Sequence, residues 1–361
     1  MAPIPRPGIL DIEAYVGGEA AIPGANRVIR LASNENPLGP SPQAQAAYVA
    51  HQDELHRYPD GASASLRETL AEIYGLEPER LVCGAGSDEL IALLVRGYVG
   101  PGDEVLHSAH GFLMYPIAAR AAGAVPVPAP ERDLTADVDA LLARVSTRTR
   151  IVFLANPNNP TGSYLSGAAL GRLRRGLPDS VLLAIDAAYA EYVTAADYED
   201  GAALVRAHDN VVMLRTFSKI YGLASLRLGW AYCPPEVAGV LNRIRGPFNV
   251  TAAAQQAGVA ALRDQDHVAR SRSHNAAQLT WFRTQAIERG LEVLPSVGNF
   301  VLLRFAKEEG RDAAAAAAHL KSRGVLVRAM GAYGLGDCLR VTIGTEAEMQ
   351  AVVEALADFP A

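Results

Sequence analysis

The sequence is poor in lysine. Only Lys219, Lys307 and Lys321 occur among its 33 lysine and arginine residues. Arginine stays protonated and cannot form an imine, so chemistry that needs a neutral amine must use one of these three side chains. Lys307 and Lys321 have charged neighbours, which is typical of a solvated surface. Lys219 lies instead among hydroxyl and aromatic side chains, with Thr216 and Ser218 just before it. It is therefore the candidate for a lysine with a chemical role.

Cysteine is also scarce. Cys83, Cys233 and Cys338 are odd in number, widely separated and without a Cys-x-x-Cys spacing. This pattern suggests neither a disulfide framework nor a set of zinc ligands. We therefore expect three buried, small hydrophobic side chains and no metal site.

The chain has no excess of positive charge and no long apolar run. Its formal net charge is -6 and its pI is near 5.8, so neither nucleic acid nor anionic lipid is an expected partner. No segment is apolar over the length needed to span a bilayer, and residues 1–10 lack the basic start and apolar core of a secretory signal. These absences predict a cytoplasmic protein that acts on small molecules.

The sequence does contain a long alternation of β-rich runs and helical patterns. Its 361 residues, 50% of them apolar, are enough for two domains. The alternation from about residue 79 to 233 predicts an α/β domain with a mostly parallel sheet. Its β-rich runs lie at residues 80–83, 104–107, 150–154, 181–185, 211–214 and 228–232.

The pattern changes after about residue 251. A long helical region is followed by predicted strands near residues 300–305, 325–327 and 339–343, with an alanine-rich helix at 312–322. This predicts a smaller α+β domain. We therefore divide the chain into an N-terminal arm rich in proline and glycine, a large domain and a small C-terminal domain, at residues 1–30, 31–252 and 253–361.

Polar or glycine-rich loops follow the predicted strands, where open α/β sheets bind their ligands. Residues 84–89 (GAGSDE) open a helix, and their backbone N–H groups together with Ser87 form a potential anion site. Helix capping by Ser87 or Asp88 explains the same residues equally well. Residues 156–162 (NPNNPTG) contain two Asn-Pro pairs and form a rigid turn, either a purely structural loop or one that fixes a side-chain amide.

Two further loops carry charged residues. Asp186 ends an apolar strand, where a buried carboxylate needs a partner such as the protonated nitrogen of a pyridine ring; a helix cap is the alternative. Lys219 follows the next strand and precedes Arg227. A fixed cation lowers the pKa of a neighbouring lysine and suits an imine beside a phosphate.

In their order along the chain, these motifs resemble those of the fold-type-I pyridoxal-phosphate aminotransferases of class I/II. The resemblance extends from residues 31–39 (LASNENPLG) through 58–61 (YPDG) to 339–345 (LRVTIGT). It implies a large domain with a mostly parallel, seven-stranded sheet flanked by helices, a smaller α+β domain and a homodimer. The chain is similar in particular to members that act on histidinol phosphate. This implies amino transfer between histidinol phosphate and 2-oxoglutarate, a step of histidine biosynthesis.

The resemblance also implies how pyridoxal 5'-phosphate (PLP) is held. Lys219 would carry the cofactor as an imine, Asp186 would pair with its pyridine nitrogen, and Asn159 and Tyr189 would hold its phenolic oxygen. Lys219, Asp186 and Tyr189 are thus the implied catalytic residues. Phe112 matches the aromatic side chain that stacks on the cofactor ring. The implied phosphate contacts are Gly86, Ser87, Ser218, Arg227 and, from the other subunit of the homodimer, Tyr58.

Four further residues match substrate-binding positions of the family. Arg340 matches the arginine that binds the α-carboxylate, a bidentate task that suits a guanidinium. Tyr15 and Arg328 match positions that contact a distal phosphate, and Asn34 also falls in the implied substrate set. The arm departs from the family pattern, with Gly17 and Glu19 where proline and lysine are usual.

Other interpretations stay open. An aromatic amino-acid aminotransferase or a threonine-phosphate decarboxylase would share the same frame. A cofactor-sensing regulator fused to a DNA-binding module would need a basic segment that the sequence lacks. A dehydrogenase that binds a nucleotide at the loop of residues 84–87 would not explain the presence of Asp186, Lys219 and Arg227.

Overall fold

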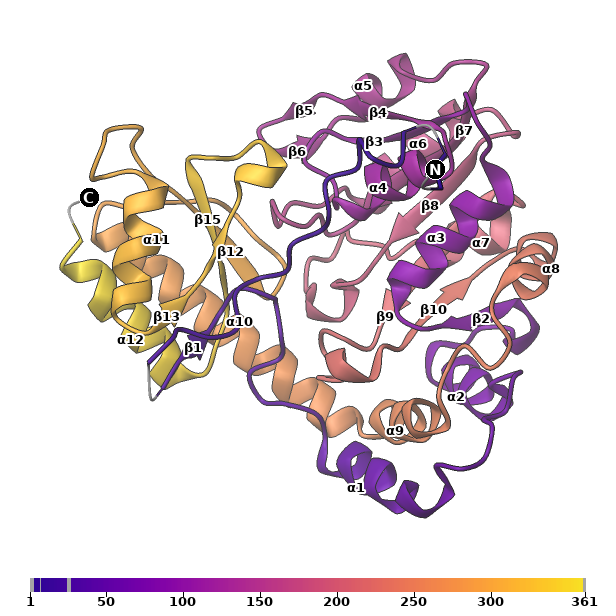
Figure 1. The fold of residues 1–361 in the computed structure, drawn as a ribbon, viewed down its shortest axis with the longest axis horizontal. Coiled ribbons are helices and arrows are strands. Elements are labelled where there is room, and N and C mark those ends of the chain that lie inside the picture. Colours follow the sequence, from indigo (N-terminus) through magenta and orange to yellow (C-terminus); the bar gives the residue numbers. More distant parts are fainter. Residues whose placement is uncertain (1–2, 7, 25–26, 360–361) are drawn as a thin grey trace.

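The computed structural model of the chain describes residues 3–6, 8–24 and 27–359 (Figure 1). Residues 1–2, 7 and 25–26 of the predicted arm, and residues 360–361 of the predicted small domain, lie outside the described residues. Figure 1 shows a large helix-flanked sheet beside a smaller sheet, with the long helix α10 (Gln265–Glu288) running from α9 towards the smaller sheet.

The large sheet has seven strands in the order β2-β10-β9-β8-β7-β3-β4. Strands β9, β8, β7, β3 and β4 run parallel to one another, and β10 is antiparallel to both of its neighbours. The predicted α/β class with a mostly parallel sheet is thus confirmed. The strands are β2 (Leu81–Gly84), β3 (Glu104–Ser108), β4 (Val125–Ala129), β7 (Thr149–Ala155), β8 (Leu182–Asp186), β9 (Val211–Thr216) and β10 (Gly229–Tyr232).

Strand β4 is the one member of this sheet that the β-rich runs miss. Its sequence, VPVPA, contains two prolines, which cannot donate to a β-ladder. The structure places it at the edge of the sheet, paired only with β3. An edge strand has one side without a ladder, so it tolerates residues that argue against a central strand.

Both faces of the large sheet are buried under helices. Along β7, Val152 and Leu154 join one hydrophobic cluster, while Ile151 and Phe153 join a second. This alternation is expected for a parallel sheet covered on both sides. The helices of this part are α1 (Pro42–Ala50), α2 (Ala64–Tyr74), α3 (Ser87–Tyr98), α4 (Met114–Ala121), α5 (Val138–Ala143), α6 (Gly167–Gly176), α7 (Ala202–Ala207), α8 (Pro235–Ile244) and α9 (Ala252–Arg263).

The smaller sheet is antiparallel, in the order β11-β12-β15-β14. Its strands are β11 (Glu292–Val293), β12 (Phe300–Arg304), β14 (Arg328–Ala329) and β15 (Cys338–Thr342), and helices α11 (Ala313–Ser322) and α12 (Glu346–Ala357) accompany it. The short strand β1 (Ile29–Arg30) pairs in parallel with β13 (Val325–Leu326), and β5 (Glu131–Arg132) forms a hairpin with β6 (Thr135–Ala136). Helix α9 follows the predicted domain boundary near residue 252, but it packs against α1 and α2, which precede that boundary. The division of the chain at residue 252 therefore stays a prediction.

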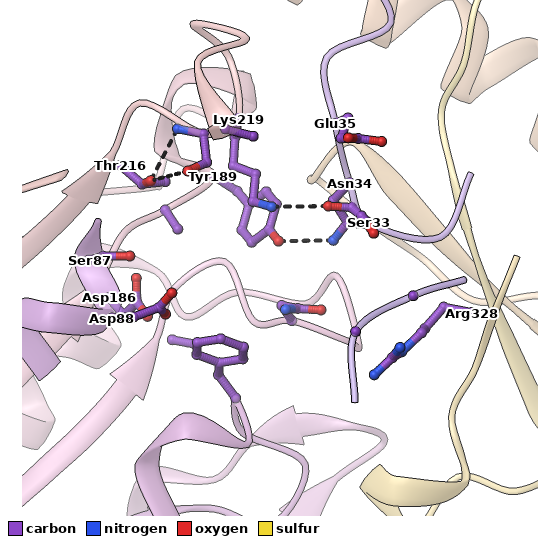
Figure 2. Close-up of a pocket in the computed structure, with 18 of the residues that line it drawn as sticks. Ser33, Asn34, Glu35, Ser87, Asp88, Asp186, Tyr189, Thr216, Lys219 and Arg328 are labelled. Carbon is purple, nitrogen blue, oxygen red and sulfur yellow. Dashed lines mark hydrogen bonds between the residues drawn. The ribbon is translucent and has the colours of Figure 1, made fainter. Parts of the chain in front are cut away.

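The chain between β1 and α1 links the two sheets. Leu31 belongs to the hydrophobic cluster of the smaller sheet, and its carbonyl accepts a hydrogen bond from the amide of Thr342 at 2.9 Å. The following residues, among them Ser33 and Asn34, face Lys219 and Tyr189 of the loops after β9 and β8 (Figure 2). The site described below therefore lies where strand ends of the large sheet meet this connecting segment and the smaller sheet.

Candidate active site

A cavity of about 300 Å³ lies at this junction. Cationic side chains outnumber anionic ones in its lining, with Lys219, Arg227, Arg328 and Arg340 against Glu35, Asp88 and Asp186. The surplus of positive side chains suits an anionic ligand. The cavity brings together twelve of the residues proposed from the sequence: Tyr15, Asn34, Ser87, Phe112, Asn159, Asp186, Tyr189, Ser218, Lys219, Arg227, Arg328 and Arg340.

Lys219 projects into this cavity from the loop after β9 (Figure 2). Its Nζ donates a hydrogen bond to the carbonyl of Ser33 at 3.2 Å and lies 5.7 Å from the ring centroid of Tyr189. Burial, followed by the nearby charge of Arg340, lowers the pKa of Lys219 from 10.5 to about 8. A substantial fraction of this amine is therefore neutral near physiological pH, as a nucleophile requires.

Asp186 ends β8 and is buried. Its Oδ2 accepts a hydrogen bond from the hydroxyl of Tyr115 at 2.8 Å, and its Oδ1 has no hydrogen-bond partner. Burial raises the pKa of this carboxyl from 3.8 to about 6, against the opposing effect of the Tyr115 hydroxyl. The 3-10 helix that follows, Ala190–Tyr192, has Tyr189 at its N-cap, so this helix does not support the capping alternative for Asp186.

Tyr189 faces the connecting segment across the cavity. Its hydroxyl accepts a hydrogen bond from Nδ2 of Asn34 at 2.9 Å (Figure 2), and Oδ1 of Asn34 accepts one from Thr342 at 3.1 Å. Asn34 has a φ of 55°, in the left-handed region that asparagine tolerates better than most residues. Burial raises the pKa of Tyr189 to about 12, so its hydroxyl keeps its proton.

The start of α3 forms one end of the site. Gly86, just before this helix, has a φ of 86°, and a Cβ at this position would lie 2.7 Å from Nη2 of Arg227. Arg227 also pairs with Asp88 at 3.0 Å. In the same cavity lining, the Ser218 hydroxyl accepts a hydrogen bond from Thr216 at 3.0 Å. Helix N-terminus, hydroxyls and guanidinium together form a cradle for an anion.

Two arginines of the smaller sheet line the other side of the cavity. Arg340 on β15 donates from Nη1 to Oδ1 of Asn159, and from Nη2 to the carbonyl of Ala32 at 2.7 Å. Arg328 on β14 donates to the carbonyl of Val16 at 2.5 Å and lies 5.9 Å from the ring centroid of Tyr15. The arm thus reaches the cavity through Tyr15 and Gly17.

The unusual Glu19 of the arm does not line this cavity. Its carboxylate pairs with Lys321 of α11 at 2.5 Å. Lys307, the third lysine, is 85% exposed. Lys307 and Lys321 therefore have the surface positions predicted for them, and Cys83, Cys233 and Cys338 are buried and free, as predicted.

Tyr58 lies apart from the cavity of its own chain. Its side chain is 83% exposed and stacks on Phe248, with 4.6 Å between the ring centroids. Gly86 does not line the cavity either, but it packs directly beside Arg227.

Sequence reasoning missed three contributors to this geometry. The carbonyls of Ala32 and Ser33 hold Arg340 and Lys219, and backbone acceptors carry no signature in residue type. The third, Tyr115, lies in the first turn of α4, three residues after Phe112, and resembles an ordinary core residue in sequence. Its only distinguishing signal is a polar group on a buried face of α4, which needs a partner.

The family profile described as Aminotransferase class I and II matches residues 26–356, and the chain belongs to this family. It is 63% identical to the histidinol-phosphate aminotransferase of Rhodospirillum centenum over 99% of this chain and 98% of that protein. The corresponding enzyme of Paramagnetospirillum magneticum is 60% identical, with 99% of both chains covered. The histidinol-phosphate aminotransferase of Sinorhizobium meliloti, solved with pyridoxal-5'-phosphate, has a TM-score of 0.90 at 30% identity and covers 98% of this chain and 96% of its own.

The side chains present fit pyridoxal phosphate, which is the cofactor of this chain. The unpartnered Oδ1 of Asp186, buried in the cavity lining, matches the proton on a pyridine nitrogen. The cradle of Ser87, Ser218 and Arg227 matches a phosphate, and the space above Gly86 is open to Arg227 because glycine has no Cβ. Within the described residues there is no cluster of three or more His, Cys, Asp or Glu side chains that could hold a metal ion. No described helix has the length and apolar character needed to cross a membrane.

Proposed function

We propose that this aminotransferase exchanges an amino group between histidinol phosphate and 2-oxoglutarate, with PLP attached to Lys219. The main support is one arrangement in the cavity. An amine of lowered pKa lies between an anion cradle on one side and the two arginines Arg328 and Arg340 on the other. The relatives with 63% and 60% identity carry the name of this activity.

Each cofactor group has a proposed holder. Lys219 binds the aldehyde carbon, Asp186 binds the ring nitrogen, and Asn159 and Tyr189 bind the phenolic oxygen. Gly86, Ser87, Ser218 and Arg227 bind the phosphate, while Phe112 covers one face of the ring. When bound, PLP supplies an aldehyde that condenses with amines and a protonated pyridine ring that accepts the electron pair of a broken Cα–H bond.

The protein's part in the reaction is proton transfer and positioning. Nζ of Lys219 would take the proton from the substrate Cα as a general base and later return a proton as a general acid. Its pKa near 8 suits both tasks close to neutral pH. Tyr189 keeps its proton and donates to the phenolic oxygen, because Asn34 already occupies one acceptor position of its hydroxyl.

The two arginines have different proposed partners. Arg340 binds the α-carboxylate of glutamate and 2-oxoglutarate, exchanging its contacts with Asn159 and the Ala32 carbonyl for a bidentate pair. Arg328, which makes one hydrogen bond to Val16, retains donors for the phosphate of histidinol phosphate, beside Tyr15.

The proposal includes a cytoplasmic homodimer in which Tyr58 completes the partner's site. In its own chain Tyr58 is exposed and away from the cavity, as a residue that serves a second copy would be. Other apolar side chains exposed in the same stretch or stacked on Tyr58 are Tyr48, Val49, Leu55 and Phe248. Such a group of exposed apolar residues is typical of a protein interface. The free state of Cys83, Cys233 and Cys338 agrees with a reducing compartment, and cell fractionation tests the location.

A steady-state assay with a panel of amino donors tests the substrate. We expect kcat/KM for histidinol phosphate to exceed that for phenylalanine by about 100-fold, because only the phosphate pairs with Arg328. Equal values would favour an aromatic amino-acid aminotransferase. Carbon dioxide release without consumption of 2-oxoglutarate would instead indicate a decarboxylase.

A further inference from the structure

Tyr115 occupies a special position next to the site without lining the cavity. It lies on α4, is fully buried, and donates its hydroxyl proton to Oδ2 of Asp186 at 2.8 Å. Its ring stacks on Phe153 of β7, with 4.7 Å between centroids and 3° between planes. The flat stacking and full burial restrict the ring to one orientation, so the hydroxyl is held at a defined point relative to Asp186.

The same ring supports a second wall of the site. Phe112, which lines the cavity, packs edge-on against Tyr115, with 5.9 Å between centroids and 89° between planes. Gly111 lies close by, since a Cβ at this position would come within 3.5 Å of the Tyr115 ring. One side chain therefore supports both Phe112 and the carboxylate of Asp186.

The hydrogen bond from Tyr115 gives the two oxygens of Asp186 different roles. Oδ2 is occupied by Tyr115, whereas Oδ1 has no partner in hydrogen-bond geometry. A carboxylate whose two oxygens were both free would be able to rotate about its last bond, and a fixed donor on one oxygen removes this freedom. The remaining oxygen is then the acceptor available to a ring nitrogen.

We propose that Tyr115 is a positioning residue for the cofactor site, which orients the carboxylate of Asp186 and keeps it ionised so that Oδ1 holds the proton of the pyridine nitrogen. This inference rests on the proposed placement of PLP against Asp186. Tyr115 contacts neither substrate nor cofactor in this scheme, and it acts only through Asp186 and Phe112.

The other groups around Asp186 explain why such a donor is needed. Burial and the negative charge of Asp88 on α3 both raise the pKa of Asp186, while Lys219 lowers it. The amide of Ala188 also lowers this pKa, although it does not satisfy Oδ1 in hydrogen-bond geometry. The hydroxyl of Tyr115 is the largest of the effects that favour the ionised form. Burial holds the pKa of Tyr115 well above 10, so it remains a donor over the working pH range. Tyr189 and Tyr198 are the further titratable side chains within electrostatic reach.

The test uses holoenzyme loaded with PLP labelled with nitrogen-15 in the ring, whose chemical shift reports the protonation of that nitrogen. In Tyr115→Phe we expect the pH midpoint for loss of the ring proton to fall by about one unit, and the dissociation constant of PLP to rise about tenfold. The matched control is Tyr232→Phe. It also removes a hydroxyl from a buried tyrosine that donates to a carboxylate, that of Glu77, but at the opposite end of the strands. We expect no shift of the midpoint in this control.

The outcomes separate this inference from the proposed function. A ring nitrogen that is unprotonated in the wild type at pH 7 would refute the pairing with Asp186 itself. A protonated wild type with an unchanged midpoint in Tyr115→Phe would overturn the role of Tyr115 alone. If Tyr115→Phe does not fold, Phe153→Leu keeps the hydroxyl but removes the stacked ring that fixes it. We expect this variant to lower the midpoint by a smaller amount, and an unchanged midpoint would overturn the role of Tyr115.

Discussion

Nδ2 of Asn34 and the hydroxyl of Tyr189 are 2.9 Å apart, although 155 positions separate the two residues in the chain. Thr342 donates to the amide oxygen of Asn34 and so turns its NH₂ group towards Tyr189. The Tyr189 oxygen accepts this bond, which leaves its own proton free to point elsewhere. This geometry predicts that Asn34, which the resemblance assigns to substrate binding, also orients the Tyr189 proton towards the cofactor.

Replacing Asn34 by aspartate should impair catalysis while leaving the fold intact. Aspartate tolerates the left-handed backbone at this position, but it has no N–H to donate to Tyr189. We expect kcat to fall by about tenfold or more, the equivalent of one lost hydrogen bond of ~1.5 kcal/mol. Steady-state kinetics at saturating substrate measure this effect.

A double-mutant cycle with Tyr189→Phe tests the assigned cause. If Asn34 acts through Tyr189, the double variant should be hardly slower than Tyr189→Phe alone. Thr342→Ser retains the hydroxyl that holds Asn34 and should remain close to the wild type. Fully additive losses would show that Asn34 acts on the substrate directly.

The lowered pKa of Lys219 predicts how the apo-protein captures its cofactor. Only the neutral amine attacks an aldehyde, so the rate of covalent attachment should rise with pH and level off above about 8, not near the ordinary lysine value of 10.5. Stopped-flow absorbance after mixing apo-protein with PLP measures this rate. Lys219→Arg should show no covalent band and no turnover. A rate that still rises between pH 9 and 10 would argue against the lowered pKa.

Arg340→Lys should separate the two half-reactions. Lysine keeps the charge but loses the bidentate geometry, so kcat/KM for glutamate should fall by about 100-fold. Histidinol phosphate has no α-carboxylate, and its half-reaction should change by much less. Single-turnover measurements with each amino donor give the two values.

Arg328→Gln is the counterpart of this variant. It should affect the half-reaction with histidinol phosphate strongly, because the phosphate loses its proposed partner. A pattern in which both variants slow both half-reactions equally would contradict the division of tasks between Arg328 and Arg340.

Hybrid dimers test the shared site. Lys219→Ala and Tyr58→Ala homodimers should each be nearly inactive, the second because PLP loses a phosphate contact. If Tyr58 serves the partner's site, mixing and re-forming the dimers should restore about a quarter of wild-type activity. Half of the dimers are then hybrids, and each hybrid has one native site out of two. Restoration would fail if Tyr58 acted within its own chain.

Much of the large sheet could be predicted from the sequence because its strands are buried on both faces. Continuous apolar runs such as residues 150–154 correspond to β7, and residues 181–185 correspond to β8 within one residue at each end. Strand β4 could not be predicted, because its prolines are tolerated only at an edge that tertiary structure creates. The predicted strand at residues 325–327 contains β13, but its partner β1 could not be predicted, because a two-residue strand carries no periodic pattern.

The site, too, could be predicted from the sequence only in part. Side chains at strand ends, such as Asp186 and Lys219, could be identified from the sequence, because a charged group next to an apolar strand is costly to bury unless it has a partner. The acceptors that hold them could not, because a carbonyl is present at every residue. Tyr115 is an intermediate case. A buried hydroxyl indicates that a hydrogen-bond partner exists, but the sequence does not show that this partner is Asp186.

The carbonyls of Ala32 and Ser33 have a consequence for how this enzyme tolerates mutation. Adjacent peptide groups hold Arg340 and Lys219, two cations of the cavity lining, and no substitution of the side chains at positions 32 and 33 removes those carbonyl oxygens. Substitutions at positions 32 and 33 should therefore be tolerated where the new side chain fits the available volume. The length of the segment is not free, because an inserted or deleted residue would move both acceptors at once. Natural variation and engineering at this point of the chain should therefore alter side chains but preserve the residue count between β1 and Asn34.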